Sequence, residues 1–389
     1  MKRRLRSSIF LFFFLAVITM FSFGSVLRRG FRGLPQFDDA ALLYSSLHAS
    51  ILFMSTEDPG ADDLMRDVDA LLSSDLTFSD IGFGRDHLPA LYLRGTLPAT
   101  SASRIRFPIR IGIPRDFGIV PVIRRSLRKW LANTQFDAEI LSHLPHLVKA
   151  PLDAYNHRAY SGQLYASCAV VGNSGILLGS GHGSRIDGHS LVIRLNNARI
   201  AGYQDDVGGK TSISFLNSNI LHLCFQRVDC FCQPYGDSVP IVMYVCQASH
   251  FVDYVVCNSS HKAPLLVTDA RFDALCARIV KYYSLKLFVE ETRKHPAEWI
   301  DVHDEKLFHY SSGMQAVILA LGICKQVSVF GFGKSKAAKH HYHTNQKMEL
   351  GLHDFRAEYA FYKDLVERPQ VVPFLKNSSF KIPPVTFYN

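Results

Sequence analysis

The chain has 389 residues and a mass of 43.8 kDa, with 48% hydrophobic and 20% charged residues, which is enough for one large globular domain or two smaller ones. This composition excludes a disordered or fibrous chain. The net charge of +9 includes seven Lys and Arg residues within the first 32 positions, and the remaining residues carry only +2. Such a remainder lacks the concentrated basic surface of nucleic-acid-binding proteins, so nucleic acid is excluded as the main partner.

The first predicted element is a membrane-spanning helix at residues 9–27, a run of nineteen residues without a charge. A helix of this length is roughly 28 Å long, which is enough to cross a bilayer core. A cleaved signal peptide is the alternative, but the run exceeds the usual apolar region and no small-x-small cleavage site precedes Arg28. The basic residues before the span favour a cytoplasmic tail of residues 1–8. A span this short suits thin early secretory membranes, so we expect a single-pass type II protein of the Golgi apparatus.

Two features of the remaining chain agree with a lumenal location. Glycosylation sequons begin at Asn258 and Asn377, and the eight cysteines all follow residue 167. Residues 28–100 mix glycine, proline, serine and scattered apolar runs without a sustained period, which predicts a stem. Residues 101–389 are then the expected lumenal catalytic domain.

Short β-type runs alternate with helix-like stretches in this region, which predicts an α/β fold. The expected strands are residues 169–171, 191–195, 212–216, 241–245 and 265–267. Residues 122–133 read as an amphipathic helix, and its basic side chains are expected to be solvated rather than to bind a ligand. These are Arg124, Arg125, Arg128 and Lys129.

The richest segment is residues 168–197, in which a strand, a glycine-rich turn and a second strand follow one another. The turn predicts a nucleotide site, because glycines allow close backbone approach and N–H donors for an anion, while Asn173 can pair with a base, ribose or phosphate. The glycines are Gly172, Gly175, Gly179, Gly181 and Gly183. A dinucleotide-binding fold is disfavoured, because no acid follows about twenty residues later at the end of the next strand.

Three other patterns resemble known motifs but do not satisfy them. The Gly-Lys-Thr and Gly-Lys-Ser triplets at residues 209–211 and 333–335 lack the glycine that a phosphate-binding P-loop needs five residues earlier. The sequence Asp-Val-Asp at residues 67–69 imitates the metal motif of many glycosyltransferases, but it lies in the predicted stem, where a solvated helix is the better interpretation.

The C-terminal third carries serines and histidines. Ser311 and Ser312 precede an apolar helix and a strand that ends in glycines, so they are either helix caps or ligand donors. His340, His341 and His343 follow, and then His353 and Glu358, which are about 140° apart on a helix and do not form a zinc motif. An imidazole near a helix N-terminus suits acid-base chemistry.

These blocks, in this order, resemble the eukaryotic sialyltransferase family and its plant sialyltransferase-like branch. Residues 168–217 are similar to the large sialylmotif, residues 311–333 to the small one, residues 341–344 to the third, and His353 with Glu358 to the very small motif. The resemblance implies a CMP-sugar donor, an inverting single displacement, no metal and no cofactor. It also implies a variant nucleotide-sugar glycosyltransferase (GT-A-like) fold, with a central, mostly parallel sheet flanked by helices.

The resemblance also assigns roles to individual positions. It places the base that deprotonates the acceptor hydroxyl at His353 and the contact to the leaving phosphate at His341. Glu358 is implied to be structural, and Cys168 and Cys324 match the disulfide between motifs. The implied donor-binding positions are Asn173, Asn196, Ser311, Ser312, Gly313 and Gly333.

The predicted function is transfer of sialic acid, or a related acidic sugar, from its CMP conjugate to a galactose-type hydroxyl of a glycan. Two alternatives stay open: a CMP-Kdo transferase acting on pectin side chains, and a catalytically silent lumenal scaffold. Thr344 stands where the third motif usually has an acid or amide, which affects acceptor recognition in particular. The expected partners are CMP-sialic acid or CMP-Kdo, an acceptor glycan on a glycoprotein or polysaccharide, and the membrane.

Overall fold

The computed structural model describes residues 39–73, 75–79, 90–94, 119–220, 233–248, 250, 261–333, 335, 338–344, 353–376 and 378–388. The predicted tail at residues 1–8, the predicted membrane span at residues 9–27 and the sequons at Asn258 and Asn377 lie outside these residues. Within the described part of the chain, no helix has both the length and the apolar character needed to cross a bilayer.

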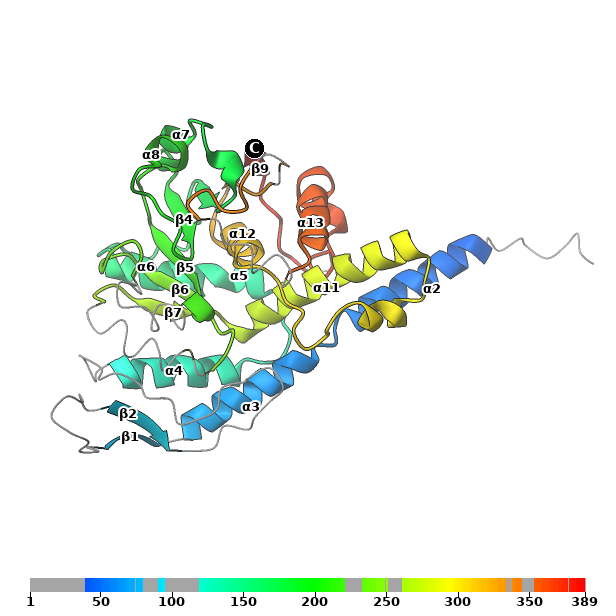
Figure 1. The fold of residues 1–389 in the computed structure, drawn as a ribbon, viewed down its shortest axis with the longest axis horizontal. Coiled ribbons are helices and arrows are strands. Elements are labelled where there is room, and N and C mark those ends of the chain that lie inside the picture. The colour runs from blue at the N-terminus through cyan, green and yellow to red at the C-terminus, as the bar shows by residue number, and fades with distance from the viewer. Residues whose placement is uncertain are drawn as a thin grey trace, which may run out of the picture. The chain divides into compact units, whose positions relative to one another are not determined.

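The chain divides into two units, Met1–Ser50 and Ile51–Asn389. The division falls inside α2 (Asp39–Met54), the helix that contains the described residues of the first unit. The second unit contains all other described elements, and Figure 1 shows their arrangement around a sheet.

The centre of the second unit is a seven-stranded sheet in which every neighbouring pair is parallel. Its order is β7-β6-β5-β4-β3-β8-β9. The strands are β3 (Cys168–Val171), β4 (Leu191–Leu195), β5 (Ile213–Asn217), β6 (Ile241–Tyr244), β7 (Leu265–Val267), β8 (Val327–Phe330) and β9 (Val385–Tyr388). The predicted α/β fold with a parallel sheet is therefore confirmed, and the five expected strands lie within one residue of β3 to β7.

The helices cover the sheet and supply its connections. They are α3 (Pro59–Ser73), α4 (Ile119–Ala132), α5 (Ile140–Leu144), α6 (Ala150–Tyr155), α7 (Gly183–Asp187), α8 (Gln204–Val207), α11 (Ala270–Thr292), α12 (Ser312–Ile323) and α13 (Phe355–Glu367). A π-helical turn (Pro145–Lys149) joins α5 to α6, and 3₁₀ turns occupy Gly175–Leu177, Pro296–Asp301 and Pro369–Val371. A separate antiparallel pair is formed by β1 (Asp75–Ser79) and β2 (Ala90–Arg94).

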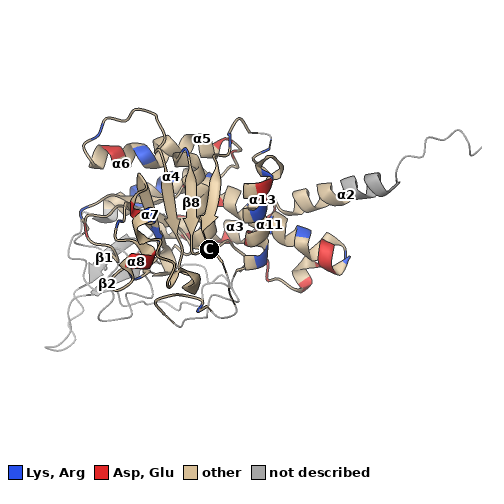
Figure 2. Ribbon diagram, turned by 90° about the horizontal axis from the view of Figure 1, so that it is seen from above, with Lys and Arg blue, Asp and Glu red and all other residues tan. Residues whose placement is uncertain are grey.

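The sheet is apolar on both faces, as a parallel sheet covered by helices must be. Arg194 is the only charged residue in its seven strands, and the charged side chains of the described residues lie mainly on helices and loops (Figure 2). Ala169 and Val171 of β3 pack with α7 and α8 in one core cluster, so the alternation along a strand directs Cys168 and Val170 to the opposite face, which α12 contacts.

The helix predicted at residues 122–133 is confirmed as α4. Its apolar face is buried through Ile123, Leu127 and Trp130, while Arg125 and Lys129 are exposed, as expected of a solvated basic face.

The predicted stem, residues 28–100, overlaps the compact unit, which begins at Ile51. Residues 51–73 belong to the same unit as the sheet, because α3 buries Val68 and Leu71 in a cluster with Leu127 of α4 and Met243 of β6. The apolar residues of α3 recur at helical spacing, but the distant segment on which they pack cannot be identified from this local pattern.

The disulfide between Cys168 and Cys324 is present, with 6.0 Å between the two Cα atoms, which confirms the pairing that the family resemblance implied. It connects the start of β3 to the end of α12, and it closes a loop with a sequence separation of 156. Cys246 and Cys276 are free thiols.

Replacing both Cys168 and Cys324 by alanine should lower the free energy of unfolding by up to about 5 kcal/mol, because the unfolded chain regains the entropy of a long open loop. Denaturant unfolding measures the change, and Cys246→Ala, which removes a free thiol, is the matched control. Equal stability of the double variant and the wild type would contradict this expectation.

Candidate functional site

A large cavity opens at the carboxyl ends of the parallel strands. The chain leaves β3 towards β4 and leaves β8 towards β9, so the two neighbouring strands send their following segments in opposite directions. Ligands bind at such a switch point in open α/β sheets, because the two loops leave a crevice between them. Residues 172–174 after β3 and residues 331–333 after β8 line the cavity, whose volume is about 1320 Å³.

All nine predicted catalytic, donor-binding and very-small-motif residues line this cavity. They are Asn173, Asn196, Ser311, Ser312, Gly313, Gly333, His341, His353 and Glu358. The fold thus gathers residues that are up to 185 positions apart, and the sheet register and the packing of α12 and α13 bring them together.

The glycine-rich turn works differently from the expected anion cradle. A Cβ atom at Gly172 would lie 2.6 Å from the carbonyl oxygen of Gly331, so the two strand-end loops approach as closely as glycine allows. The N–H groups of Gly179 and Gly181 donate to the carboxylate of Asp206 at 2.9 and 3.0 Å. These two N–H groups therefore bind a carboxylate of the protein itself and not, as was expected, an anion of a nucleotide, and of the five glycines only Gly172 lines the cavity.

The turn also holds the loop that carries His341. The N–H of Gly175 donates to the carbonyl oxygen of Lys339 at 2.9 Å, and the N–H of Tyr342 donates to the carbonyl oxygen of Asn173 at 2.8 Å. A Cβ atom at Gly175 would meet the Lys339 carbonyl oxygen at 2.5 Å, so a larger residue would displace this loop. Gly175 and the carbonyl group of Asn173 therefore hold the loop on either side of His341.

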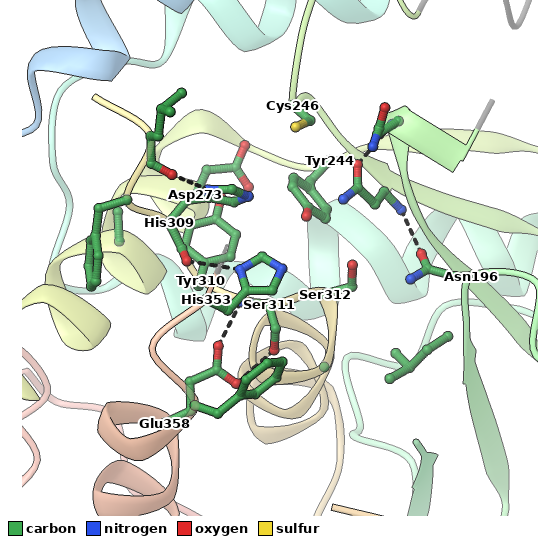
Figure 3. A pocket seen from close by; sticks show the side chains of 18 of the residues that line it. Asn196, Tyr244, Cys246, Asp273, His309, Tyr310, Ser311, Ser312, His353 and Glu358 are labelled. Atoms are coloured by element: carbon green, nitrogen blue, oxygen red, sulfur yellow. Dashed lines mark hydrogen bonds between the residues drawn. The ribbon is translucent and has the colours of Figure 1, made fainter. Parts of the chain in front are cut away.

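The two asparagines present different groups to a ligand. Asn196 adopts a left-handed backbone with φ of 50°, and its Oδ1 accepts a hydrogen bond from the N–H of Asn217 at 3.1 Å (Figure 3). Because its Oδ1 is occupied by this bond, Asn196 offers a ligand the NH₂ of its side-chain amide as a donor. The Oδ1 of Asn173 is buried and has no hydrogen-bond partner among the described residues, which is costly unless a ligand donates to it.

The N-terminus of α12 points its first turn at the cavity. Ser311 caps this helix, because its hydroxyl accepts from the N–H of Met314 at 3.1 Å, and it donates to Glu358 at 2.7 Å. The hydroxyl hydrogen of Ser311 is thus committed to Glu358. The N–H groups of Ser312 and Gly313 lie in the first turn, where the helix dipole favours an anion such as a phosphate.

Glu358 of α13 joins two helices through one buried carboxylate. Its two oxygens accept from the N–H and the hydroxyl of Ser311, each at 2.7 Å, and Tyr362 donates to it at 3.3 Å (Figure 3). Burial raises the pKa of Glu358 to about 7, although these hydrogen bonds oppose the rise. This geometry fits a structural partner, because the carboxylate is committed to Ser311 and Tyr362.

His353 immediately precedes Asp354, the N-cap of α13, and lies at the centre of the cavity (Figure 3). Its Nδ1 is 3.2 Å from the carbonyl oxygen of His309. Since a carbonyl oxygen can only accept, Nδ1 carries the proton and the lone pair lies on Nε2. A neutral imidazole in this tautomer has the acceptor atom that a general base requires.

His341 belongs to a row of imidazole rings. Its ring stacks on His340 with 4.5 Å between centroids and on His343 with 5.8 Å, and its Nδ1 is 3.4 Å from the hydroxyl of Thr344. A histidine on this loop can donate a hydrogen bond to an anionic group that is held at the N-terminus of α12.

Asp273 and His309 also line the cavity, and sequence reasoning did not single them out. Asp273 in the first turn of α11 accepts from Trp130, Thr268 and Gln315, and burial raises its pKa to about 7. The ring of His309 packs edge-on against His353 with 4.8 Å between centroids. Asp273 is one of several charged residues of α11, so its burial in the cavity wall gives no signal that a motif search detects.

The described residues contain no group of three His, Cys, Asp or Glu side chains placed to hold a metal ion. Metal independence itself stays a prediction.

Comparison with known proteins decides the family. The model of glycosyltransferase family 29 (sialyltransferase) matches residues 122–369, which span β3 to β8, α12 and α13. The chain belongs to this family. The family match therefore covers both strands of the switch point and both helices that Glu358 joins.

Three relatives illustrate which proteins this chain is similar to. Sialyltransferase-like protein 1 of Oryza sativa subsp. japonica is 47% identical over all of both chains. A protein of Arabidopsis thaliana named beta-1,6-galactosyltransferase is 48% identical over 87% of this chain and 86% of its own. The mouse CMP-N-acetylneuraminate-beta-galactosamide-alpha-2,3-sialyltransferase 2 is 29% identical over 48% of this chain and 50% of its own.

The buried Glu358 predicts a pH dependence of stability. Its pKa is raised from 4.5 to about 7, so between these pH values the folded chain holds a proton that the unfolded chain has released. The free energy of unfolding should therefore decrease as the pH rises through this range, by on the order of 3 kcal/mol for this group. Glu358→Gln should lose this part of the slope, as denaturant unfolding across the range would measure.

Glu367→Gln is the matched control, because Glu367 is an exposed glutamate on the same helix. It should keep the wild-type slope. Parallel slopes for the wild type and Glu358→Gln would show that the folded chain does not retain the proton.

Proposed function

We propose that this chain is an inverting, metal-independent glycosyltransferase that moves a sugar from a nucleotide donor to a galactose-type hydroxyl of a glycan. The observation that carries the proposal is the orientation of His353. The His309 carbonyl fixes its tautomer, in a cavity that also contains the helix N-terminus of α12 and the partnerless Oδ1 of Asn173.

The proposed reaction is one displacement. The acceptor hydroxyl gives its proton to Nε2 of His353 as its oxygen bonds to the anomeric carbon from the face opposite the leaving group. The bond between that carbon and the phosphate oxygen breaks, and its electron pair stays on the phosphate. The N–H groups at the start of α12, together with His341, stabilise the charge that develops there. Asn173, Asn196 and Gly333 hold the nucleotide part of the donor.

Two donor classes are candidates. The Arabidopsis relative, at 48% identity over 87% of this chain, is named for galactosyl transfer, which favours a galactosyl donor here. The second class is a CMP-linked acidic sugar, sialic acid or Kdo, which the motif pattern and the more distant mouse relative favour. The higher identity and wider coverage put the galactosyl donor first.

We also propose that the enzyme is a single-pass type II protein of the Golgi membrane. Residues 9–27 would be the anchor, and the sequons at Asn258 and Asn377 would lie in the lumen with the catalytic unit.

The test is a donor screen of the full chain in detergent with UDP-galactose, CMP-Neu5Ac and CMP-Kdo, and with galactose and pectin oligosaccharides as acceptors. Replacing His353 by alanine should reduce transfer by about 100-fold or more, because a general base typically contributes this much. Nucleotide binding should be retained, because His353 acts on the acceptor proton.

His146→Ala is the control, because His146 is exposed and does not line the cavity. Transfer from UDP-galactose supports the first donor class, and transfer only from a CMP-sugar supports the second. Nucleotide binding without any transfer that depends on His353 would contradict both enzyme proposals and favour a lumenal scaffold.

A further inference from the structure

The cavity extends past His353 into a part that the family motifs do not cover. We call this part the α3 lobe; it is lined by Asp58, Asp63, Asp67, Trp130, Asp273 and Lys281. In Figure 3, Asp273 and His309 lie on one side of His353, and Asn196 lies on the other. If the nucleotide occupies the side of Asn196, the α3 lobe is the space on the opposite side of the reacting atoms.

The size of the cavity is compatible with two occupants. A pocket for one small ligand is typically about 300 to 1,000 Å³. The cavity of about 1320 Å³ exceeds this range, which leaves room for an acceptor beside a donor.

The α3 helix turns different faces to the core, the cavity and the solvent. Val68 and Leu71 are buried in the cluster that includes Trp130. Asp63 and Asp67, one turn apart, line the cavity, whereas Asp69 is exposed. The helix expected at residues 67–69 is confirmed, and Asp69 is exposed as expected, whereas Val68 is buried and Asp67 is only partly exposed.

Asp67 differs from the other acids around it. The residue is partly exposed, but its Oδ1 is shielded from solvent and has no hydrogen-bond partner among the described residues. Partial burial together with the charge of Asp63 raises the pKa of Asp67. Asp63 is paired with Arg66 and, at 3.7 Å, with Lys306, while Asp273 accepts three hydrogen bonds. A shielded carboxylate oxygen without a donor is costly, so a ligand that donates a hydrogen bond to Asp67 would stabilise it.

The charge of the lobe selects which ligand could supply that group. The acids that line this side outnumber the basic residues among the described residues. The acids are Glu57, Asp58, Asp62, Asp63, Asp67, Asp273 and Glu305, and the basic residues are Arg278, Lys281 and Lys306. Two of these three cations are already paired with acids, Lys281 with Glu305 and Lys306 with Asp63. A neutral molecule rich in hydroxyl groups suits this surface, whereas a polyanion would be repelled.

We propose that the α3 lobe binds the non-reacting sugars of a neutral acceptor oligosaccharide, and that Asp67 accepts hydrogen bonds from their hydroxyl groups. The proposal rests on the proposed glycosyl transfer, since it places the acceptor beside the base. It predicts that the enzyme recognises at least two acceptor sugars, and that uronic-acid chains are poor acceptors.

The test measures acceptor binding to the full chain in detergent, without a donor, by titration calorimetry. The probes are methyl β-galactoside, β-linked galactotriose and trigalacturonate. Galactotriose should bind the wild type more tightly than the monosaccharide. Asp67→Asn should weaken galactotriose about tenfold, as expected for loss of one hydrogen bond to a charged group, and leave methyl β-galactoside unchanged.

Asp69→Asn is the matched control, because it makes the same change two residues away on the exposed face. Asp67→Ala should weaken galactotriose as Asp67→Asn does. Thermal unfolding monitors the fold of each variant, and removing a carboxylate without a partner should not lower the midpoint. Trigalacturonate should bind the wild type more weakly than galactotriose.

Wild-type affinity for galactotriose in Asp67→Asn, tighter binding of trigalacturonate, or an equal loss of nucleotide affinity would overturn the proposal. His353→Ala should keep both the galactotriose affinity and its dependence on Asp67. Binding that depends on Asp67 without any transfer would contradict the proposed function and support the lobe. Transfer together with galactotriose binding that does not depend on Asp67 would support the proposed function and contradict the proposal for the α3 lobe.

Discussion

The parallel pairing of β3 with β8 places the ends of two distant segments side by side. Cys168 of β3 lies opposite Val327 of β8, and the disulfide to Cys324 fastens the same edge of the pair. Because the following loops depart in opposite directions, a crevice must form at the carboxyl ends of these strands. Gly172 lets the two loops meet without closing it, so the rest of the site depends on this one pairing.

A second constraint orients the groups around the crevice. Glu358 accepts two hydrogen bonds from Ser311, and it thereby joins the first turn of α13 to the N-terminus of α12. His353, the proposed base, precedes α13, and the N–H groups proposed to hold a phosphate begin α12. A single buried carboxylate therefore connects the segment that carries His353 to the N-terminus of α12. Burial raises the pKa of Glu358, because it disfavours the charged form of this carboxyl group.

The two sides of the cavity differ in their origin within the chain. The side of Asn196 comes from loops that follow the strands, within the segment that matches family 29. The α3 lobe takes much of its wall from residues 55–67, which lie before that segment. If the proposed function holds, the wall from this earlier segment can alter acceptor choice without altering the residues of the matched segment. In that wall, Asp67 has a shielded carboxylate oxygen without a hydrogen-bond partner among the described residues.

The sequence by itself predicted the strands of the sheet other than β9 and the helix α4, because these depend on local periodicity within a single segment. The disulfide pairing and the set of residues around His353 join distant segments, and the sequence indicated them only through the family resemblance. Only the tertiary structure decided that Gly179 and Gly181 serve Asp206, that Ser311 is held by Glu358, and that Asp67 lines the cavity. In each of these cases the partner lies 25 or more residues away, or on another element, and burial rather than residue type sets the role. No local pattern contains that information.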